Sequence, residues 1–330
     1  MYLVTESVTV MVDTINMRRR GGVSKTERKR LEGRLRNRSS HYFEKSGQGV
    51  VKGFLPNLNG LPDTDLKVTI SENSVKIGET SLCKWFLGNN LYTMTARDLK
   101  HAIEAIGDLL HLPMDGFEVA RLDVGHNLIM EYSVAGYLNQ LGALARHDRQ
   151  RMSATGLYYK TALRTVVLYD KIEECRKNRG VIPTEYAGHD VLRLEVRFLN
   201  RVAAQLGYRS ITAEMLKCTE LYRKLLDKWA EYYWTVDKIN DVMIDFRGIK
   251  TKRELYQTGV AKLVEEAGGE LGFLDQISEA QTLGDLTKKQ AHDLRGAVKF
   301  SCRGSLTTRP NNLITELEDK VRDAVKLLGE

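Results

Sequence analysis

The period of the hydrophobic pattern changes along this 330-residue chain, and that change limits the fold more than any other feature. In the first ninety residues, apolar and polar residues alternate in several short stretches, which is typical of β-strands joined by turns. Helical and strand-like patterns then mix as far as Gly207, and the pattern beyond it is helical. We therefore expect an α+β fold with a central antiparallel sheet and packed helices in residues 1–208, followed by a helical region in residues 209–330.

Capping and turn residues give the expected positions of the individual elements. We expect strands at 7–17, 50–56, 66–70, 73–78, 117–124 and 191–199, and one strand or a hairpin at 155–171. Turn residues at 59–60 and 62–63 separate the early strands. We expect helices from the capping box Thr95–Asp98 and from Ser133 (with an apolar face to Leu144), a long amphipathic segment at 212–240, and helices around 252–266, 287–300 and 311–328.

The charge balance favours a polyanionic partner. The chain has a formal net charge of +7 and a pI near 9.1. A dense basic run at 17–38 contains no aromatic residue, so any contact there would follow a phosphate backbone and would not stack on bases. The same run is equally typical of a solvated helix or loop.

The cysteines and the apolar stretches bear on location. Four cysteines are scattered without a CxxC pair, which argues against a zinc ribbon or a disulfide framework and suits a reducing cytoplasm. No stretch reaches the roughly 18 apolar residues that span a bilayer, and the first residues lack the pattern of a signal peptide. We expect a cytoplasmic protein with no membrane partner.

Three of the expected strands carry their charged residues on one face. Side chains alternate between the two faces of a strand, so Arg121 shares a face with Asp123, and Tyr169 shares a face with Lys171. In the third strand one face holds Arg193, Glu195 and Arg197. If the opposite, apolar faces pack on the helices, all these side chains meet on one surface.

This set of side chains is suited to phosphoryl transfer on DNA. The carboxylates of Asp123 and Glu195 can hold a hard divalent cation such as Mg²⁺ or Mn²⁺. The phenol of Tyr169 can attack phosphorus, and the neighbouring Lys171 ammonium would favour the phenolate. An ordinary solvated sheet with cross-strand ion pairs would show the same alternation.

Five blocks occur in an order and spacing that resemble a known family. They are MVDTINM near the start, LGNNLYTMTARDL (87–99), ARLDV (120–124), RTVVLYDKIEE (164–174) and VLRLEVRFLNRVAAQLG (191–207). Over about residues 7–207 the chain resembles the replication initiators of filamentous phages and related small plasmids, the gene II/X family of rolling-circle nicking-joining enzymes. Related plasmid initiators are regarded as a circularly permuted form of the nuclease fold with a His-hydrophobic-His (HUH) metal motif, and that order would explain why no His-x-His occurs here.

The resemblance implies a role for each candidate residue. Tyr169 would be the nucleophile with Lys171 as its partner, and Asp123 and Glu195 would be the acids of the metal site. His126 is a candidate third ligand, or an ordinary satisfied or surface histidine. Residues that could contact DNA are Arg121, Arg193, Arg197, Lys160 and Arg164, of which the last two could instead simply solvate their strand.

We therefore expect a site-specific single-strand DNA endonuclease and strand transferase that starts rolling-circle replication. Its partner would be origin DNA, as a duplex or as a hairpin with a single-stranded nick site. The chain has no GxxxxGK motif, so a helicase, like the polymerase, would come from the bacterial host. Tyr158 and Tyr159 could pack within the protein, or one of them could act as a second nucleophile. The sequence also leaves open whether copies of the chain form an oligomer. The alternatives are a non-catalytic DNA-binding copy-control protein, a mobilisation relaxase and, least favoured, an RNA-binding protein.

Overall fold

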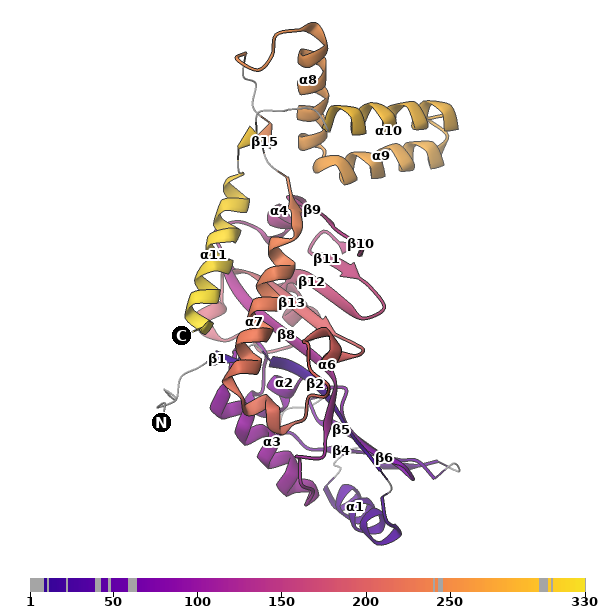
Figure 1. Cartoon of the computed structure of the whole chain (residues 1–330), viewed down its shortest axis with the longest axis vertical. Helices are drawn as coiled ribbons and strands as arrows, with labels where there is room; N and C mark the ends of the chain where they lie inside the picture. The colour runs from indigo at the N-terminus through magenta and orange to yellow at the C-terminus, as the bar shows by residue number, and fades with distance from the viewer. Residues whose placement is uncertain are drawn as a thin grey trace.

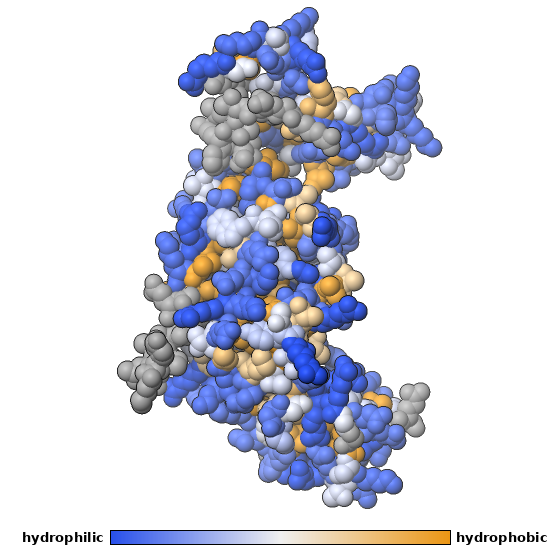
Figure 2. All heavy atoms as spheres, in the orientation of Figure 1, coloured by the Kyte–Doolittle hydropathy of each residue, from blue (hydrophilic) through white to orange (hydrophobic). Residues whose placement is uncertain are grey.

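The computed structural model describes residues 9–10, 12–21, 23–38, 43–46, 49–58, 64–239, 241–242, 246–302, 308–309 and 311–329. The expected turns at 59–63, and residues 7, 8 and 11 of the first expected strand, lie outside these ranges. A sheet runs through the middle of an elongated molecule, with long helices beside it and a separate group of helices at one end (Figure 1). The side of the molecule drawn in Figure 2 is mainly hydrophilic.

A ten-stranded antiparallel sheet is the framework of the described chain, which confirms the expected α+β class. In spatial order its strands are β10 (Asp148–Ser153), β11 (Gly156–Lys160), β12 (Arg164–Asp170), β13 (Asp190–Phe198), β8 (Glu118–Met130), β2 (Val12–Arg20), β6 (Ser74–Gly78), β5 (Leu66–Ser71), β4 (Val51–Leu55) and β3 (Phe43–Lys45). The expected strand or hairpin at 155–171 is the hairpin β11–β12.

Alternation of side chains gives the centre of this sheet one apolar face. Leu192, Leu194, Val196 and Phe198 of β13 are all fully buried. They face α7 (Thr219–Trp234), whose Trp229 indole donates a hydrogen bond of 3.0 Å to the Leu194 carbonyl oxygen. The last helix, α11 (Asn312–Gly329), packs beside α7 and β8. These two helices therefore cover the apolar face at the centre of the sheet, although both belong to residues 209–330, which we expected to form a separate helical region.

The remaining helices are short or lie at the ends of the molecule. They are α1 (Lys25–Arg38), α2 (Leu82–Leu87), α3 (Ala96–Leu110), α4 (Val134–Asn139), α5 (Lys171–Lys177), α6 (Val202–Gln205), α8 (Lys252–Glu266), α9 (Gly269–Leu283) and α10 (Lys288–Cys302). The capping box predicted for α3 is present between Thr95 and Asp98. No helix in the described ranges is both long and apolar enough to cross a membrane.

Two expectations about helices were wrong. The helix expected from Ser133 to Leu144 ends at Asn139, and the Ser133 side chain makes no capping hydrogen bond. Residues Leu141–Leu144 instead form strand β9, which pairs with β14 (Val236–Lys238) at the end of the segment expected to be one helix to residue 240. This pairing joins segments far apart in the chain, so local periodicity does not reveal it.

The hydrophobic core does not divide near residue 208, where we expected a boundary between two regions. Buried residues of α7 and α11, such as Trp229 and Leu317, belong to the same cluster as those of the sheet. A separate cluster joins α8, α9 and α10 through Val264, Ile277 and Val298. The paired strands β15 (Asp241–Val242) and β16 (Thr308–Arg309) lead into and out of this three-helix unit.

The continuous core predicts how the chain tolerates truncation. Removing residues 243–307 and joining Val242 to Thr308 with a short glycine linker should leave the main core folded, because β15 and β16 already hold these two ends together. A chain ending at residue 208 should aggregate, because it loses α7 and α11 and exposes the apolar face of the sheet. Gel filtration and thermal unfolding followed by circular dichroism would measure both outcomes. A soluble, cooperatively unfolding 1–208 fragment would contradict this account.

Candidate active site

The polar face of the four central strands, opposite to α7, brings the predicted charged residues together. Cross-strand pairing sets Tyr169 of β12 opposite Arg193 of β13, and Glu195 of β13 opposite Gly125 of β8. Two residues further along β13, at the next pair on the same face, Arg197 lies opposite Asp123 of β8. Directly opposed residues share a face of the sheet, so the strand faces deduced from alternation are the faces observed.

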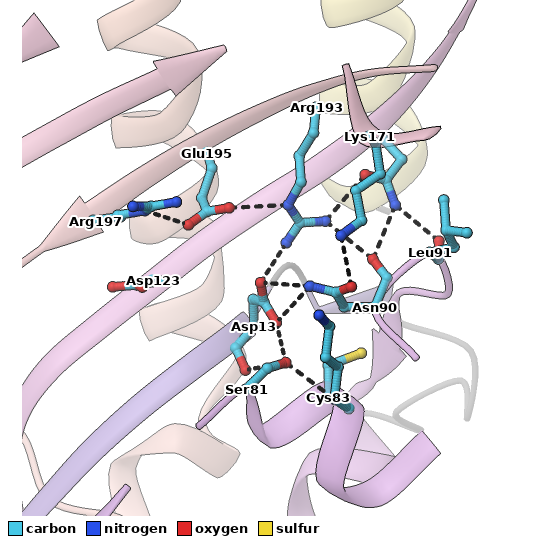
Figure 3. Close-up of polar contacts among 12 residues, drawn as sticks. Asp13, Ser81, Cys83, Asn90, Leu91, Asp123, Lys171, Arg193, Glu195 and Arg197 are labelled. Carbon is cyan, nitrogen blue, oxygen red and sulfur yellow. Dashed lines mark hydrogen bonds and ion pairs between the residues drawn. The ribbon is translucent and has the colours of Figure 1, made fainter. Parts of the chain in front are cut away.

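The guanidinium of Arg193 is the centre of this face (Figure 3). Its side chain is only 3% exposed, and it donates to Glu195 on its own strand at 3.0 Å and to Asp13 on β2 at 2.9 Å. To reach Asp13 it crosses β8 above Gly125, where an added Cβ atom would lie 3.0 Å from its Nη2. An irregularity in the pairing between Val12 and Thr14 leaves Asp13 as an extra residue in β2, and its carboxylate lies on the Arg193 side.

A buried network surrounds this ion pair. Asn90, in the loop after α2, donates from its side-chain amide to Asp13 at 3.1 Å and accepts from the Lys171 ammonium at 2.7 Å. Ser81, the N-cap of α2, also donates to the Asp13 carboxylate. Burial opposes ionisation of Asp13, but Arg193, Ser81 and Lys171 together hold its pKa below the ordinary value of 3.8. The network therefore keeps Asp13 ionised and ties the α2 loop to the sheet.

Tyr169 and Glu195 are in direct contact. The phenol oxygen of Tyr169 lies 3.3 Å from Oε2 of Glu195, to which it can donate a hydrogen bond. Glu195 is buried, and its other oxygen accepts a bond of 2.6 Å from Arg197. Burial, and then the negative charge of Glu195, raise the pKa of Tyr169 well above 10. The phenol is therefore protonated at neutral pH, with a carboxylate placed to receive its proton.

The expected electrostatic help from Lys171 to Tyr169 is not what the structure supports. Lys171 is the first residue of α5, fully buried, and its Nζ lies 5.9 Å from the centre of the Tyr169 ring. Its ammonium is bound to Asn90 and, at 2.5 Å, to Glu174. Asp170, between Tyr169 and Lys171 in the chain, caps α5 by accepting from the Glu173 amide. Lys171 is therefore a buried partner of Asn90 and Glu174, and the pKa of Tyr169 is raised rather than lowered.

Asp123 lies beside Glu195 under a cover of arginine. Its two oxygens accept from Arg121 Nε at 2.9 Å and Nη2 at 2.6 Å, while the carboxylate itself is almost fully buried. Burial raises the pKa of Asp123 to about 6, with Glu195 adding to the rise and Arg121 opposing it. The Arg121 and Arg197 side chains are 32% and 29% exposed, so these two arginines separate the carboxylates from solvent.

Two predicted residues lie on the other face of the sheet. His126 pairs with Leu194 and places its ring against Trp229 at 6.4 Å between centroids, and burial lowers its pKa to about 4. Arg164 lies over the ring of Tyr232 on α7. Neither is brought to the face of Asp123 and Glu195, because each is offset by an odd number of positions from the functional residues of its own strand.

The remaining predicted residues divide in the same way. Lys160 shares the polar face, with its ammonium bound to Gln150 at 2.6 Å and 5.3 Å from the ring centre of Tyr158. Tyr159 faces the core, where its hydroxyl donates to the Gly142 carbonyl oxygen, which is the packing role considered for it. Arg193 is too deeply buried to contact DNA as we had expected.

The residues present fit a hard divalent cation in their chemistry. Among the described residues, no group of three or more His, Cys, Asp or Glu side chains is arranged to hold a metal ion. Asp123 and Glu195 nevertheless offer the carboxylate oxygens that Mg²⁺ and Mn²⁺ prefer. Arg121 and Arg197, which are partly exposed, are the groups that would have to give way.

Sequence reasoning missed three residues of this network: Asp13, Asn90 and Asn127. Asn127 accepts from Arg193 at 3.1 Å, and its position four residues after Asp123 would have placed it on the same face. Asp13 lies within the block MVDTINM, which was quoted only as a strand. Asn90 lies in a loop, where no periodicity applies, and although it falls within the block LGNNLYTMTARDL, that block was quoted only for the family resemblance.

Gly125→Ala should destabilise the site without removing any of its functional side chains. The added Cβ would press on the Arg193 guanidinium, which four partners hold in place, so we expect a loss of about 1–3 kcal/mol in the free energy of unfolding. Urea unfolding measures this loss. Gly33→Ala in α1 is the matched control, since nothing lies within 4 Å of its added Cβ and alanine favours a helix, so it should be neutral or stabilising. If both changes altered the free energy of unfolding equally, Arg193 would not cross β8 above Gly125 as described.

The raised pKa of Asp123 predicts a pH-dependent gain of stability in Asp123→Asn. The folded pKa of about 6 lies above the ordinary 3.8. Below pH 4 Asp123 is mainly neutral in both the folded and the unfolded protein, and burying it costs little. As the pH rises through 6 the folded protein must bury a charged carboxylate, so its free energy of unfolding falls. In metal-free buffer at pH 8, the free energy of unfolding of Asp123→Asn should therefore exceed that of the parent by about 3 kcal/mol, and most of the difference should disappear near pH 4. Urea unfolding at both pH values measures it. A loss of stability at pH 8 would mean that the Arg121 pair outweighs burial.

Comparison with known proteins places the chain in a family. Residues 24–224, more than half of the chain, match the family Phage_CRI, which is described as the N-terminal part of a replication-associated protein. The matched region contains β13, β8 and β12, and so most of the polar face, and it ends within α7. No curated protein matches the chain. The extent of the family match shows that this chain belongs to the Phage_CRI family of replication-associated proteins, consistent with the gene II-type initiators that the five sequence blocks indicated.

Proposed function

We propose that this protein is a nicking-joining enzyme that starts rolling-circle DNA replication. Membership of a replication-associated family supports a role in replication. The contact between the Tyr169 phenol and the Glu195 carboxylate carries the more specific proposal, because it pairs a nucleophile with a base on a face rich in arginine. Tyr169 would cut one strand of the origin and keep the 5′ phosphate until the strand is rejoined.

The proposed step transfers one phosphoryl bond and one proton. The phenol oxygen of Tyr169 bonds to phosphorus as the bond to the 3′ oxygen breaks. Glu195 Oε2 receives the phenol proton and gives it up again, directly or through solvent, to the leaving 3′ oxygen, which becomes a 3′ hydroxyl. Reversal of the step would reseal the strand, so the phosphotyrosine conserves the bond energy and no nucleotide hydrolysis is needed.

The arginines around the carboxylates support the same proposal. Arg121 and Arg197 are partly exposed and can turn from Asp123 and Glu195 towards a phosphate, whose developing charge they would stabilise. Arg193 stays buried and orients Glu195. When bound to Asp123 and Glu195, Mg²⁺ or Mn²⁺ would polarise the scissile phosphate. The proposed partners are origin DNA, with its duplex or hairpin form open, and the helicase and polymerase of a bacterial host.

A covalent adduct tests the nucleophile. The protein is incubated with Mn²⁺ and DNA that carries the replication origin of its own genome, and the linked peptide is mapped by mass spectrometry. We expect the adduct on Tyr169 and none in Tyr169→Phe, because phenylalanine has no oxygen to attack phosphorus. Glu195→Gln should slow adduct formation by about 10²–10⁴-fold through loss of the base.

Tyr158→Phe is the matched control for Tyr169→Phe. Tyr158 lies on the neighbouring strand and on the same face, opposite Val167, so the change removes an equivalent hydroxyl from the same surface. It should leave the adduct unchanged. If Tyr158→Phe removes the adduct and Tyr169→Phe does not, the nucleophile is misassigned.

One observation favours a non-catalytic DNA-binding copy-control protein as the second candidate. Arginine side chains occupy all four oxygens of Asp123 and Glu195, as in a purely structural ion-pair network. Salt-sensitive DNA binding, with no adduct under any divalent metal, would favour this candidate over the enzyme.

A further inference from the structure

A basic groove leads away from the polar face near Arg121. Its first part, about 390 Å³, lies over β2, β5 and β6, and its second part, about 440 Å³, lies between the end of β2 and α6. Arg18, Ala120 and Asn200 line both parts, so the two parts are continuous. We use the name basic groove for this continuous hollow.

Cations outnumber anions along the basic groove. Its basic lining residues are Arg18, Arg20, Lys67, Lys76, Arg121, Arg201 and Arg209, and its carboxylates are Glu79 and Glu118. Lys67 pairs with Glu79 at 2.6 Å, and Arg20 reaches Glu118 only at 4.0 Å. The groove therefore has a surplus of positive charge.

Several of these cations have no acidic partner within the described part of the chain. No ion pair there involves Arg18, Lys76, Arg201 or Arg209. The Nε of Arg18, where the two parts of the groove meet, is buried without a hydrogen-bond partner among the described residues. A buried unpaired donor beside unpaired cations indicates a surface built to receive an anion.

We propose that the basic groove binds the sugar–phosphate backbone of duplex DNA next to the nick site. Arginine and lysine contact phosphates without reading sequence. Proteins that hold single strands combine such cations with aromatic side chains on which bases stack, and the described residues lining this groove include none. The lining therefore favours the backbone of a base-paired strand over an unpaired one.

Arg121 connects the basic groove to the candidate active site. It lines the first part of the groove and also holds Asp123 at 2.6 Å. A duplex seated in the groove would thus meet the carboxylates at this arginine, and a phosphate that draws Arg121 away would uncover Asp123. This placement rests on the proposed nicking function, whereas the binding itself does not.

The test measures DNA binding in a protein that cannot form the tyrosine adduct. In the Tyr169→Phe background, the double change Arg201→Gln and Arg209→Gln removes two exposed cations of the groove. Fluorescence anisotropy with two unrelated duplexes of about 30 base pairs should show binding weakened about 10-fold or more near 0.1 M salt, equally for both. The slope of log affinity against log salt should fall by about 2, since each lost phosphate contact removes about 0.9.

The control is the double change Arg97→Gln and Arg223→Gln, which removes the same charge from exposed residues outside the groove. It should leave the slope within about 0.5 of the parent. The proposal is overturned if both double variants behave alike, if only one of the two duplexes is affected, or if a single-stranded oligonucleotide loses affinity while the duplexes do not. Failure of the tyrosine adduct would leave this result intact, because no cleavage is measured.

Discussion

The buried guanidinium of Arg193 is the interaction on which the centre of this protein depends. A buried cation is costly unless it is paired, and removing one partner of a buried ion pair costs roughly 3–5 kcal/mol. Arg193 meets that requirement with donors aimed at Glu195, Asp13, Asn127 and the backbone of Asn90. Three strands and one loop are therefore held in a single arrangement around one side chain.

That arrangement separates two kinds of arginine on one face. Arg193 is buried and fully engaged, so it fixes the position of Glu195 and thereby of the Tyr169 hydroxyl beside it. Arg121 and Arg197 are partly exposed and hold the carboxylates from the solvent side, where they remain available to an incoming phosphate. The raised pKa of Asp123 is consistent with a carboxylate kept in place for function at some cost in stability.

The helical half of the chain has two different relations to this site. Helices α7 and α11 complete the main core, and the family match itself extends into α7. Helices α8 to α10 form their own small core beyond the β15–β16 pair, away from the polar face (Figure 1). The basic groove, by contrast, is formed by the β2–β6 end of the sheet and the α6 segment. Arg18 and Arg20 of the early basic run therefore line one groove together with residues near 200–211, which are distant in the sequence.

The sequence alone determined the class of fold, most strand positions and the faces of Tyr169, Glu195 and Asp123, because alternation within a strand is a local property. The same rule would have excluded His126, whose spacing from Asp123 puts it on the opposite face. Only the tertiary structure decided the order of the strands, the irregular pairing that leaves Asp13 as an extra residue of β2 facing Arg193, and the hydrogen bond from Lys171 to Asn90. These features join segments up to 180 residues apart, and no local period encodes which distant partner a buried charge will find.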